Sequence, residues 1–178
     1  MKNVLILSSS PRRGGNSDTL CDEFMQGAIE SGHRVEKVFL RDKTIHPCTG
    51  CGVCSQYKKP CPQKDDAAEI IGKMLAADVI VMATPVYFYA MSAQMKTLID
   101  RCCGPYTEMK NKEFYFIATA AEEDETIMDR IVASFMGFLD CLENPTVKGT
   151  LFCGGVWHAG EIKGSPKLQE AYEMGRLV

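Results

Sequence analysis

Five short apolar segments alternate with helical patterns along this 178-residue chain, and this alternation limits the fold more than any other feature. The apolar segments lie at residues 4–7, 35–40, 78–84, 114–119 and 150–154. The helical patterns lie at about 17–32, 66–75, 92–102, 125–141 and 166–177. Strands that alternate with helices predict a parallel sheet with helices on both faces. We therefore expect an α/β fold with a doubly wound, five-stranded parallel sheet.

Composition and charge narrow the range of partners. The chain is 46% hydrophobic and 24% charged, with a net charge of −3 and nine cysteines. A chain without basic excess is not expected to bind nucleic acid or an anionic membrane. The apolar run at 4–7 is too short for a signal peptide, and no apolar stretch is long enough to span a membrane. The odd cysteine count argues against a disulfide framework. We expect a single domain over residues 1–178, located in the cytoplasm.

The segment after the first expected strand collects hydrogen-bond donors. Ser10, Arg12, Asn16 and Ser17 lead into the start of a helix. A helix N-terminus offers unpaired N–H groups and positive potential, so this segment suits a single terminal phosphate. It matches neither the dinucleotide-binding pattern nor the triphosphatase loop. The structural alternative is a helix cap with two exposed arginines.

A second loop follows the third expected strand. Pro85, Val86, Tyr87 and Phe88 form it. Ligands of doubly wound sheets bind outside the carboxyl ends of the strands, where the strand order reverses. The aromatic side chains predict a surface for a planar heteroaromatic ring. The structural alternative is a hydrophobic loop over the core.

A cysteine-rich loop at about 41–64 carries four closely spaced thiols. They are Cys48, Cys51, Cys54 and Cys61. Iron–sulfur clusters are held by compact runs of this kind, whereas zinc sites usually place two cysteine pairs further apart. A 4Fe–4S cluster with these four ligands, bound zinc and free thiols are the three alternatives. At least four of the other five cysteines are expected to be buried small apolar side chains. Those five are Cys21, Cys102, Cys103, Cys141 and Cys153.

These motifs together resemble the flavodoxin-like NADPH-dependent FMN reductase family. The resemblance lies in Ser10-Pro11-Arg12 with Asn16-Ser17, in Pro85-Val86-Tyr87, and in Ile99-Asp100-Arg101. The cysteine run followed by Asp65-Asp66 resembles the iron–sulfur flavoprotein branch of the family. The resemblance implies a sheet of order 2-1-3-4-5, FMN at the strand ends, and a homodimer or homotetramer.

The resemblance also implies roles for individual residues. It implies that the FMN phosphate is held by Ser10, Arg12, Asn16 and Ser17. It implies that Pro85, Val86, Tyr87 and Phe88 lie along the ribityl chain and the isoalloxazine, and that a third loop begins at Thr119.

We therefore expect an FMN-dependent oxidoreductase that passes electrons from NAD(P)H or a reduced carrier to a quinone or another small acceptor. The alternative is an iron–sulfur flavoprotein that transfers electrons or senses redox state without substrate turnover of its own. No side chain is assigned a catalytic role, because the flavin carries the chemistry. The glycine-flanked loop at 154–160, which holds Trp157 and His158, is expected to reach the flavin site or a partner subunit.

Overall fold

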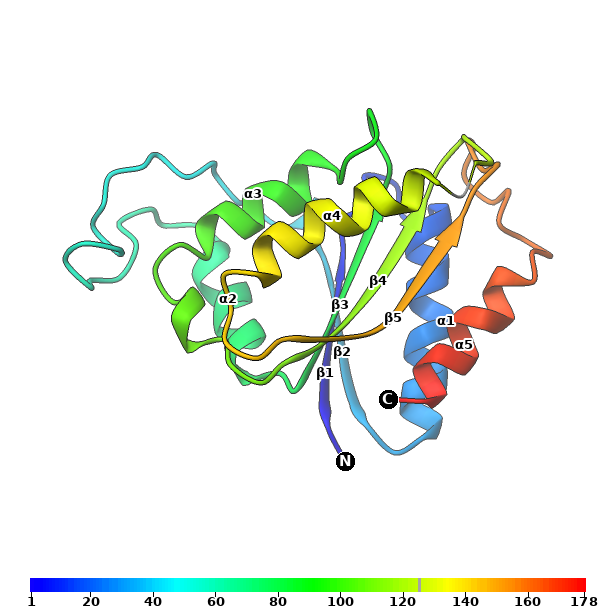
Figure 1. The fold of residues 1–178 in the computed structure, drawn as a ribbon, viewed down its shortest axis with the longest axis horizontal. Helices are drawn as coiled ribbons and strands as arrows, with labels where there is room; N and C mark the ends of the chain where they lie inside the picture. Colours follow the sequence, from blue (N-terminus) through cyan, green and yellow to red (C-terminus); the bar gives the residue numbers. More distant parts are fainter. Residues whose placement is uncertain (125) are drawn as a thin grey trace.

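A five-stranded parallel sheet forms the centre of the computed structural model, which describes residues 1–124 and 126–178 (Figure 1). The strand order is β2-β1-β3-β4-β5, and every neighbouring pair is parallel. The strands are β1 (Asn3–Ser8), β2 (Arg34–Phe39), β3 (Val79–Pro85), β4 (Glu113–Thr119) and β5 (Thr146–Cys153). This topology confirms the predicted doubly wound sheet of order 2-1-3-4-5.

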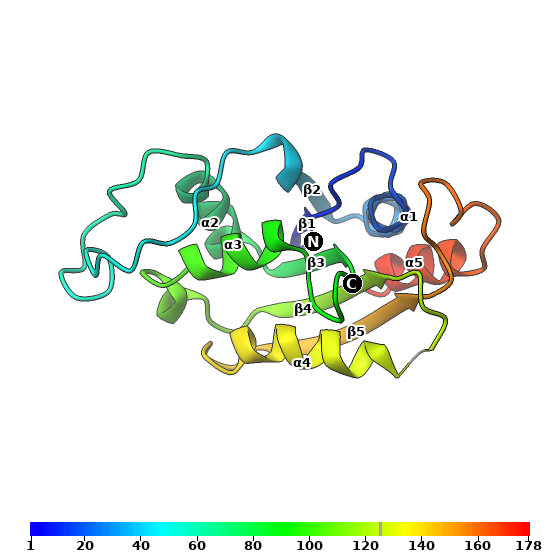
Figure 2. The same ribbon diagram turned by 90° about the horizontal axis from the view of Figure 1, so that it is seen from above.

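Helices cover both faces of the sheet, as Figures 1 and 2 show. One face carries α1 (Asn16–Glu30) and α5 (Lys167–Arg176), and the other carries α2 (Ala67–Ala76), α3 (Ala93–Arg101) and α4 (Ile127–Leu139). Two short 3₁₀ helices are Leu40–Asp42 and Tyr106–Glu108. In β1, Val4 and Ile6 pack on the α1 side, whereas Leu5 and Leu7 pack on the other side. Burial on both faces explains why this strand is a continuous apolar run.

The start of β5 differs from the sequence prediction by several residues. β5 begins at Thr146, four residues before the expected strand. The sequence pattern missed this start because the first three residues of β5 are exposed on the sheet edge and form no apolar run. The expected start of the fourth helix falls on residue 125, which lies outside the described residues. Over residues 1–124 and 126–178, none of the helices combines the length and apolar character needed to cross a bilayer.

The strand order reverses between β1 and β3, which are neighbours in the sheet. Chain connections leave these two strands toward opposite edges, so a crevice is expected at their carboxyl ends. The cysteine loop lies elsewhere. Both views show the segment around residues 43–64 extending away from the sheet beside α2 and α3 (Figures 1 and 2).

Candidate functional site

The segment between β1 and α1 folds into a tight loop closed by its own hydrogen bonds. Ser10 Oγ donates to the Arg12 carbonyl oxygen at 2.9 Å and accepts the Arg12 N–H at 3.2 Å. The Gly15 N–H donates to the same carbonyl oxygen at 3.1 Å. A Cβ atom on Gly15 would lie only 2.5 Å from Ser10 Oγ. Glycine at this position therefore lets the loop close and present the N-terminus of α1 to the sheet edge.

The first turn of α1 holds unpaired donors. Gly15 is the N-cap residue and supplies no side-chain acceptor, so the first N–H groups of the helix lack that partner. Ser17 Oγ is buried, and no other buried side-chain nitrogen or oxygen in residues 1–124 and 126–178 lacks a hydrogen-bond partner. Buried polar atoms are nearly always paired. An unpaired hydroxyl at the positive end of a helix dipole therefore fits an anionic group such as a phosphate.

Asp18 lies in the same turn, but its charge is compensated. Its Oδ1 accepts from Ser8 Oγ at 2.9 Å and from Lys37 Nζ at 3.0 Å, and its Oδ2 accepts the Gly14 N–H at 3.0 Å. Partial burial by itself would lower the pKa of Lys37, yet its hydrogen bonds to Asp22 and Asp18 raise that pKa, so the ammonium stays charged. The carboxylate of Asp18 is therefore neutralised and does not oppose an anion at the loop.

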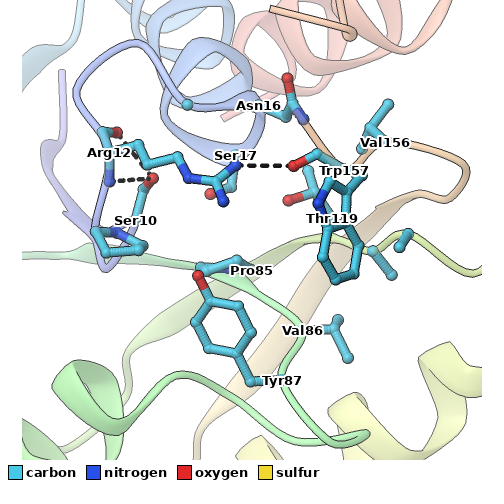
Figure 3. Close-up of a pocket in the computed structure, with 14 residues that line it drawn as sticks. Ser10, Arg12, Asn16, Ser17, Pro85, Val86, Tyr87, Thr119, Val156 and Trp157 are labelled. Carbon is cyan, nitrogen blue, oxygen red and sulfur yellow. Dashed lines mark hydrogen bonds between the residues drawn. The ribbon is translucent and has the colours of Figure 1, made fainter. Parts of the chain in front are cut away.

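Four segments line a pocket at the carboxyl edge of the sheet (Figure 3). They are the loop after β1 and the segments after β3, β4 and β5. The lining residues are Ser10, Pro11, Arg12, Gly15, Asn16, Ser17, Pro85, Val86, Tyr87, Thr119, Ala120, Ala121, Val156 and Trp157. Of the nine residues predicted to contact the cofactor, the structure brings all but Phe88 to this pocket.

Phe88 lies at the tip of a strained turn. Tyr87 and Ala90 exchange two backbone hydrogen bonds at 3.0 Å, which leaves Phe88 and Tyr89 as the central residues. Their φ angles are 49° and 60°, a region that residues other than glycine rarely adopt. Phe88 is 100% exposed. The turn directs Phe88 into solvent, so the structure does not place it along the pocket as the resemblance implied.

Buried hydroxyls join β1, β3 and α3 beneath the pocket. Ser9 Oγ donates to the Ala83 carbonyl oxygen at 2.8 Å, and Ser92 Oγ donates to Ser9 Oγ at 2.9 Å. The Ser92 N–H donates to Thr84 Oγ1 at 2.8 Å. Ser9, Thr84 and Ser92 are all fully buried. This network fixes the start of α3 relative to the two strand ends that form the crevice.

The segment after β5 adds a fourth side to the pocket. Val156 and Trp157 line it, although neither was among the predicted cofactor residues. The Val156 N–H donates to the Ala120 carbonyl oxygen at 2.9 Å, and Arg12 Nη1 donates to the Trp157 carbonyl oxygen at 2.8 Å. The only sequence signal was the glycine-flanked loop after the fifth strand. The sequence predicted that this loop reaches the flavin site or a partner subunit, and the position of Val156 and Trp157 in the pocket lining agrees with the first of these.

The structure does not gather the thiols of the cysteine loop into one ligand group. Cys48 and Cys51 are exposed, whereas Cys54 and Cys61 are half-buried. Within the described part of the chain, no three His, Cys, Asp or Glu side chains are arranged to hold a metal ion. Burial raises the pKa of Cys54, and the charge of Cys103 raises it further. The donor type suits an iron–sulfur cluster, but the positions do not, and none of the four loop cysteines lines the pocket.

The remaining five cysteines divide differently from the prediction. Cys21, Cys102 and Cys153 are buried, and burial raises their pKa values, that of Cys102 to about 12. Cys103 and Cys141 are exposed, so the prediction that at least four of the five are buried is wrong. Both lie just beyond a helix end, where helical periodicity no longer indicates which side chains face the core.

A buried ion pair holds the two ends of the cysteine loop together. Arg101, at the end of α3, donates to the two carboxylate oxygens of Asp65 at 2.5 and 3.1 Å, and the side chains are 2% and 0% exposed. Arg101 also donates to the His46 carbonyl oxygen at 2.8 Å and to Cys61 Sγ at 3.3 Å. Burial alone would raise the pKa of Asp65, but hydrogen bonds from Arg101, His46 and Ala67 hold it well below its usual range.

Comparison with known sequences gives a consistent set of relatives. A sequence model described as NADPH-dependent FMN reductase matches residues 2–153. An iron-sulfur flavoprotein of Archaeoglobus fulgidus is 32% identical over 162 residues, which cover 85% of this chain and 79% of that protein. An iron-sulfur flavoprotein of Methanocaldococcus jannaschii is 44% identical over 98 residues, 55% of this chain and 50% of that protein. The matched segment spans about half the length of several such relatives.

Comparison with solved structures identifies the same fold. An NAD(P)H:quinone oxidoreductase from Methanothermobacter marburgensis has a TM-score of 0.75 at 19% identity, with 98% of this chain and 94% of that chain covered. An azoreductase from Bacillus anthracis has a TM-score of 0.73 at 19% identity, with both chains fully covered. At these identities the similarity shows a shared flavodoxin-like fold.

Proposed function

Because the chain belongs to the NADPH-dependent FMN reductase family, in its iron–sulfur flavoprotein branch, we propose that it is an FMN-dependent oxidoreductase. Electrons enter from NAD(P)H or a reduced carrier and leave to a quinone or another small acceptor. The quinone oxidoreductase and the azoreductase that share the fold support a small-molecule acceptor. The odd count of nine cysteines, which argues against a disulfide framework, supports a cytoplasmic location.

The buried, unpaired hydroxyl of Ser17 carries the proposal of an FMN site. It lies at the N-terminus of α1 and lines the pocket together with Ser10 and Arg12. These groups would hold the phosphate through hydroxyl, guanidinium and backbone N–H donors. Pro85, Val86, Tyr87 and Thr119 would border the rest of the nucleotide. Bound FMN supplies the hydride and single-electron chemistry, and the protein supplies position and electrostatics.

The loop also sets a preference between flavins. One helix N-terminus with a short loop serves one phosphate group well, whereas FAD carries two and an adenosine. We expect FMN to bind more tightly than FAD. A titration of flavin-free protein with both compounds measures the difference, and a preference for FAD would contradict the assignment of the Ser10–Ser17 loop.

The test of the function uses protein purified without oxygen. Its absorption spectrum should show flavin bands. Extraction of the bound flavin should yield FMN in an amount stoichiometric with the protein chain. Steady-state oxidation of NADH or NADPH should then depend on added quinone or ferricyanide. Protein that retains no flavin and binds none on reconstitution would refute the proposal.

The cysteine loop supports a second candidate function. Cys48 and Cys51 are exposed on a segment that extends away from the sheet (Figure 1). Exposed thiols on such a segment are accessible to a protein partner, as an electron-transfer or redox-sensing protein requires. Steady-state turnover distinguishes the two functions. Flavin that is reduced chemically but supports no NAD(P)H oxidation with any small acceptor would favour this second candidate.

A further inference from the structure

Residues 154–162 form a segment whose backbone is held firmly beside the pocket. Arg12 Nη1 donates to the carbonyl oxygen of Trp157 at 2.8 Å (Figure 3). Glu161 Oε2 accepts the N–H of Trp157 at 2.6 Å and the N–H of His158 at 2.8 Å. The backbone of Trp157 is therefore fixed at both its N–H and its carbonyl group.

Asn16 ties the same segment to the start of α1. Its Nδ2 donates to the His158 carbonyl oxygen at 2.9 Å, and its Oδ1 accepts the N–H groups of Gly160 at 3.1 Å and Ile162 at 3.3 Å. The residue is 8% exposed. Both the oxygen and the nitrogen of the amide are thus engaged with the segment, whereas the next residue, Ser17, has an unpaired hydroxyl.

The indole of Trp157 borders the part of the pocket away from the phosphate loop. In Figure 3 its ring lies beside Thr119 and points toward Val86, with the Tyr87 ring across the pocket. Trp157 is 66% exposed even though its backbone is held by two hydrogen-bond partners, Glu161 and Arg12. A large flat side chain that is exposed, braced and turned toward a pocket can contact a planar ligand.

We propose that Trp157 is the wall against which the riboflavin part of FMN rests, and that Asn16 positions this wall rather than binding the phosphate. The inference rests on the proposed FMN site. It replaces the role that family resemblance implied for Asn16, because the amide is already hydrogen-bonded to the segment after β5. Trp157 then determines how tightly the non-phosphate part of the nucleotide is held.

The experiment compares dissociation constants for FMN and for riboflavin, which lacks the phosphate, in the flavin-free full chain. Trp157→Ala and Asn16→Ala should each weaken both ligands by the same factor, between about threefold and tenfold. Ser17→Ala should weaken FMN and leave riboflavin unchanged. The double variant Asn16→Ala with Trp157→Ala should be no weaker than Trp157→Ala alone, because the two residues act through one contact.

Two further variants guard against loss of folding. Glu161 is exposed and holds the backbone of Trp157, so Glu161→Ala should repeat the effect of Asn16→Ala without altering a buried residue. Tyr57 is 67% exposed, close to the exposure of Trp157, but it lies on the cysteine loop, so Tyr57→Ala should change neither constant.

Trp157 is the sole tryptophan, so iodide quenching of its fluorescence should weaken when either ligand binds.

The outcomes separate the inference from the function on which it rests. Selective loss of FMN in Asn16→Ala, with riboflavin unchanged, would make Asn16 a phosphate ligand and overturn the proposal. Unchanged dissociation constants for FMN and riboflavin in Trp157→Ala, in a protein that binds FMN normally, would refute the role of Trp157 as the wall. That result would leave the proposed function intact. A wild-type protein that binds neither compound would refute the FMN site itself and the inference with it.

Discussion

Two serine hydroxyls near the strand ends have opposite environments. Ser92 Oγ, beneath the pocket, donates to Ser9 Oγ at 2.9 Å and completes a buried network. Ser17 Oγ is equally buried and has no partner within the described residues. Burying a hydroxyl without a hydrogen bond destabilises a fold by about 1–3 kcal/mol. A bound anion that accepts from Ser17 would remove this cost, which is the physical reason for assigning the phosphate to this position.

We predict that Arg12→Ala combined with Ser17→Ala weakens FMN binding by a few kcal/mol, with about 1.5–3 kcal/mol from the charged hydrogen bond and less from the neutral one. Isothermal titration of flavin-free protein measures the change. Arg13→Ala is the matched control, because Arg13 is a neighbouring arginine that contacts Asp42 and does not line the pocket. Unchanged FMN affinity in the double variant would contradict the phosphate assignment.

Among the elements, α3 links the pocket to the cysteine loop. Its N-cap residue, Ser92, belongs to the hydroxyl network at the strand ends, and its last residue, Arg101, holds both ends of the loop. The nine residues of the helix span about 13 Å at 1.5 Å per residue. One rigid helix therefore sets the position of the loop stem relative to the pocket.

Loss of Arg101 should destabilise the protein strongly. Arg101→Met leaves the buried carboxylate of Asp65 without its partner, which should lower the free energy of unfolding by about 3–5 kcal/mol. Arg101→Lys keeps the charge but loses the two-pronged contact, so its effect should be smaller. Lys96→Met, on the exposed side of α3, breaks only a surface pair with Asp100 and should change stability by less than about 1 kcal/mol. Urea denaturation that shows equal losses of unfolding free energy in Arg101→Met and Lys96→Met would contradict the stabilising role of the buried Arg101–Asp65 ion pair.

Asp65 should also make stability depend on pH in the acid range. Its pKa in the folded protein lies below its ordinary value of 3.8. As the pH falls through that value, the unfolded chain takes up a proton that the folded protein does not, so stability decreases below about pH 4. Asp65→Asn lacks this proton uptake and should show a shallower decline. Unfolding free energies measured from pH 2 to pH 6 test this, and parallel curves for the two proteins would count against it.

The cysteine loop gives a prediction about metal content. If a cluster forms on Cys48, Cys51, Cys54 and Cys61, anaerobically purified protein should hold about four iron atoms per chain with matching sulfide. Cys54→Ala should lose them. Cys141→Ala is the control, since this thiol is also exposed but lies beyond α4, outside the loop. Zinc in place of iron, or iron that survives Cys54→Ala, would show that the ligand set is wrong.

For the whole molecule, the exposed aromatic turn beside the pocket indicates association. Tyr87, Phe88 and Tyr89 are 44%, 100% and 49% exposed, and contiguous exposed apolar side chains commonly mark interaction sites. We predict a homodimer or homotetramer at micromolar concentration, weakened by Phe88→Ser and unaffected by Tyr57→Ser. Multi-angle light scattering measures the mass. A monomer mass for the unaltered protein would refute the association.

The order of elements and the location of the pocket were determined by local sequence. The apolar run at residues 4–7 indicates a strand buried on both faces, and such a strand requires helices on both sides of the sheet. Parallel strands place their carboxyl ends at one edge, so Ser10, Pro85 and Thr119 were expected to meet, and they do. The polar start of β5 at Thr146 was missed because an exposed edge strand has no apolar run.

Tertiary structure alone decided which side chains support the site. Arg12 meets Trp157 across 145 positions of sequence, and Arg101 meets Asp65 across 36. Asn16 is a plausible phosphate ligand by its position in the sequence, yet its amide is engaged by residues more than 140 positions away. Local patterns report backbone propensity and burial over a few residues, whereas these contacts exist only after the sheet brings distant loops to the same edge.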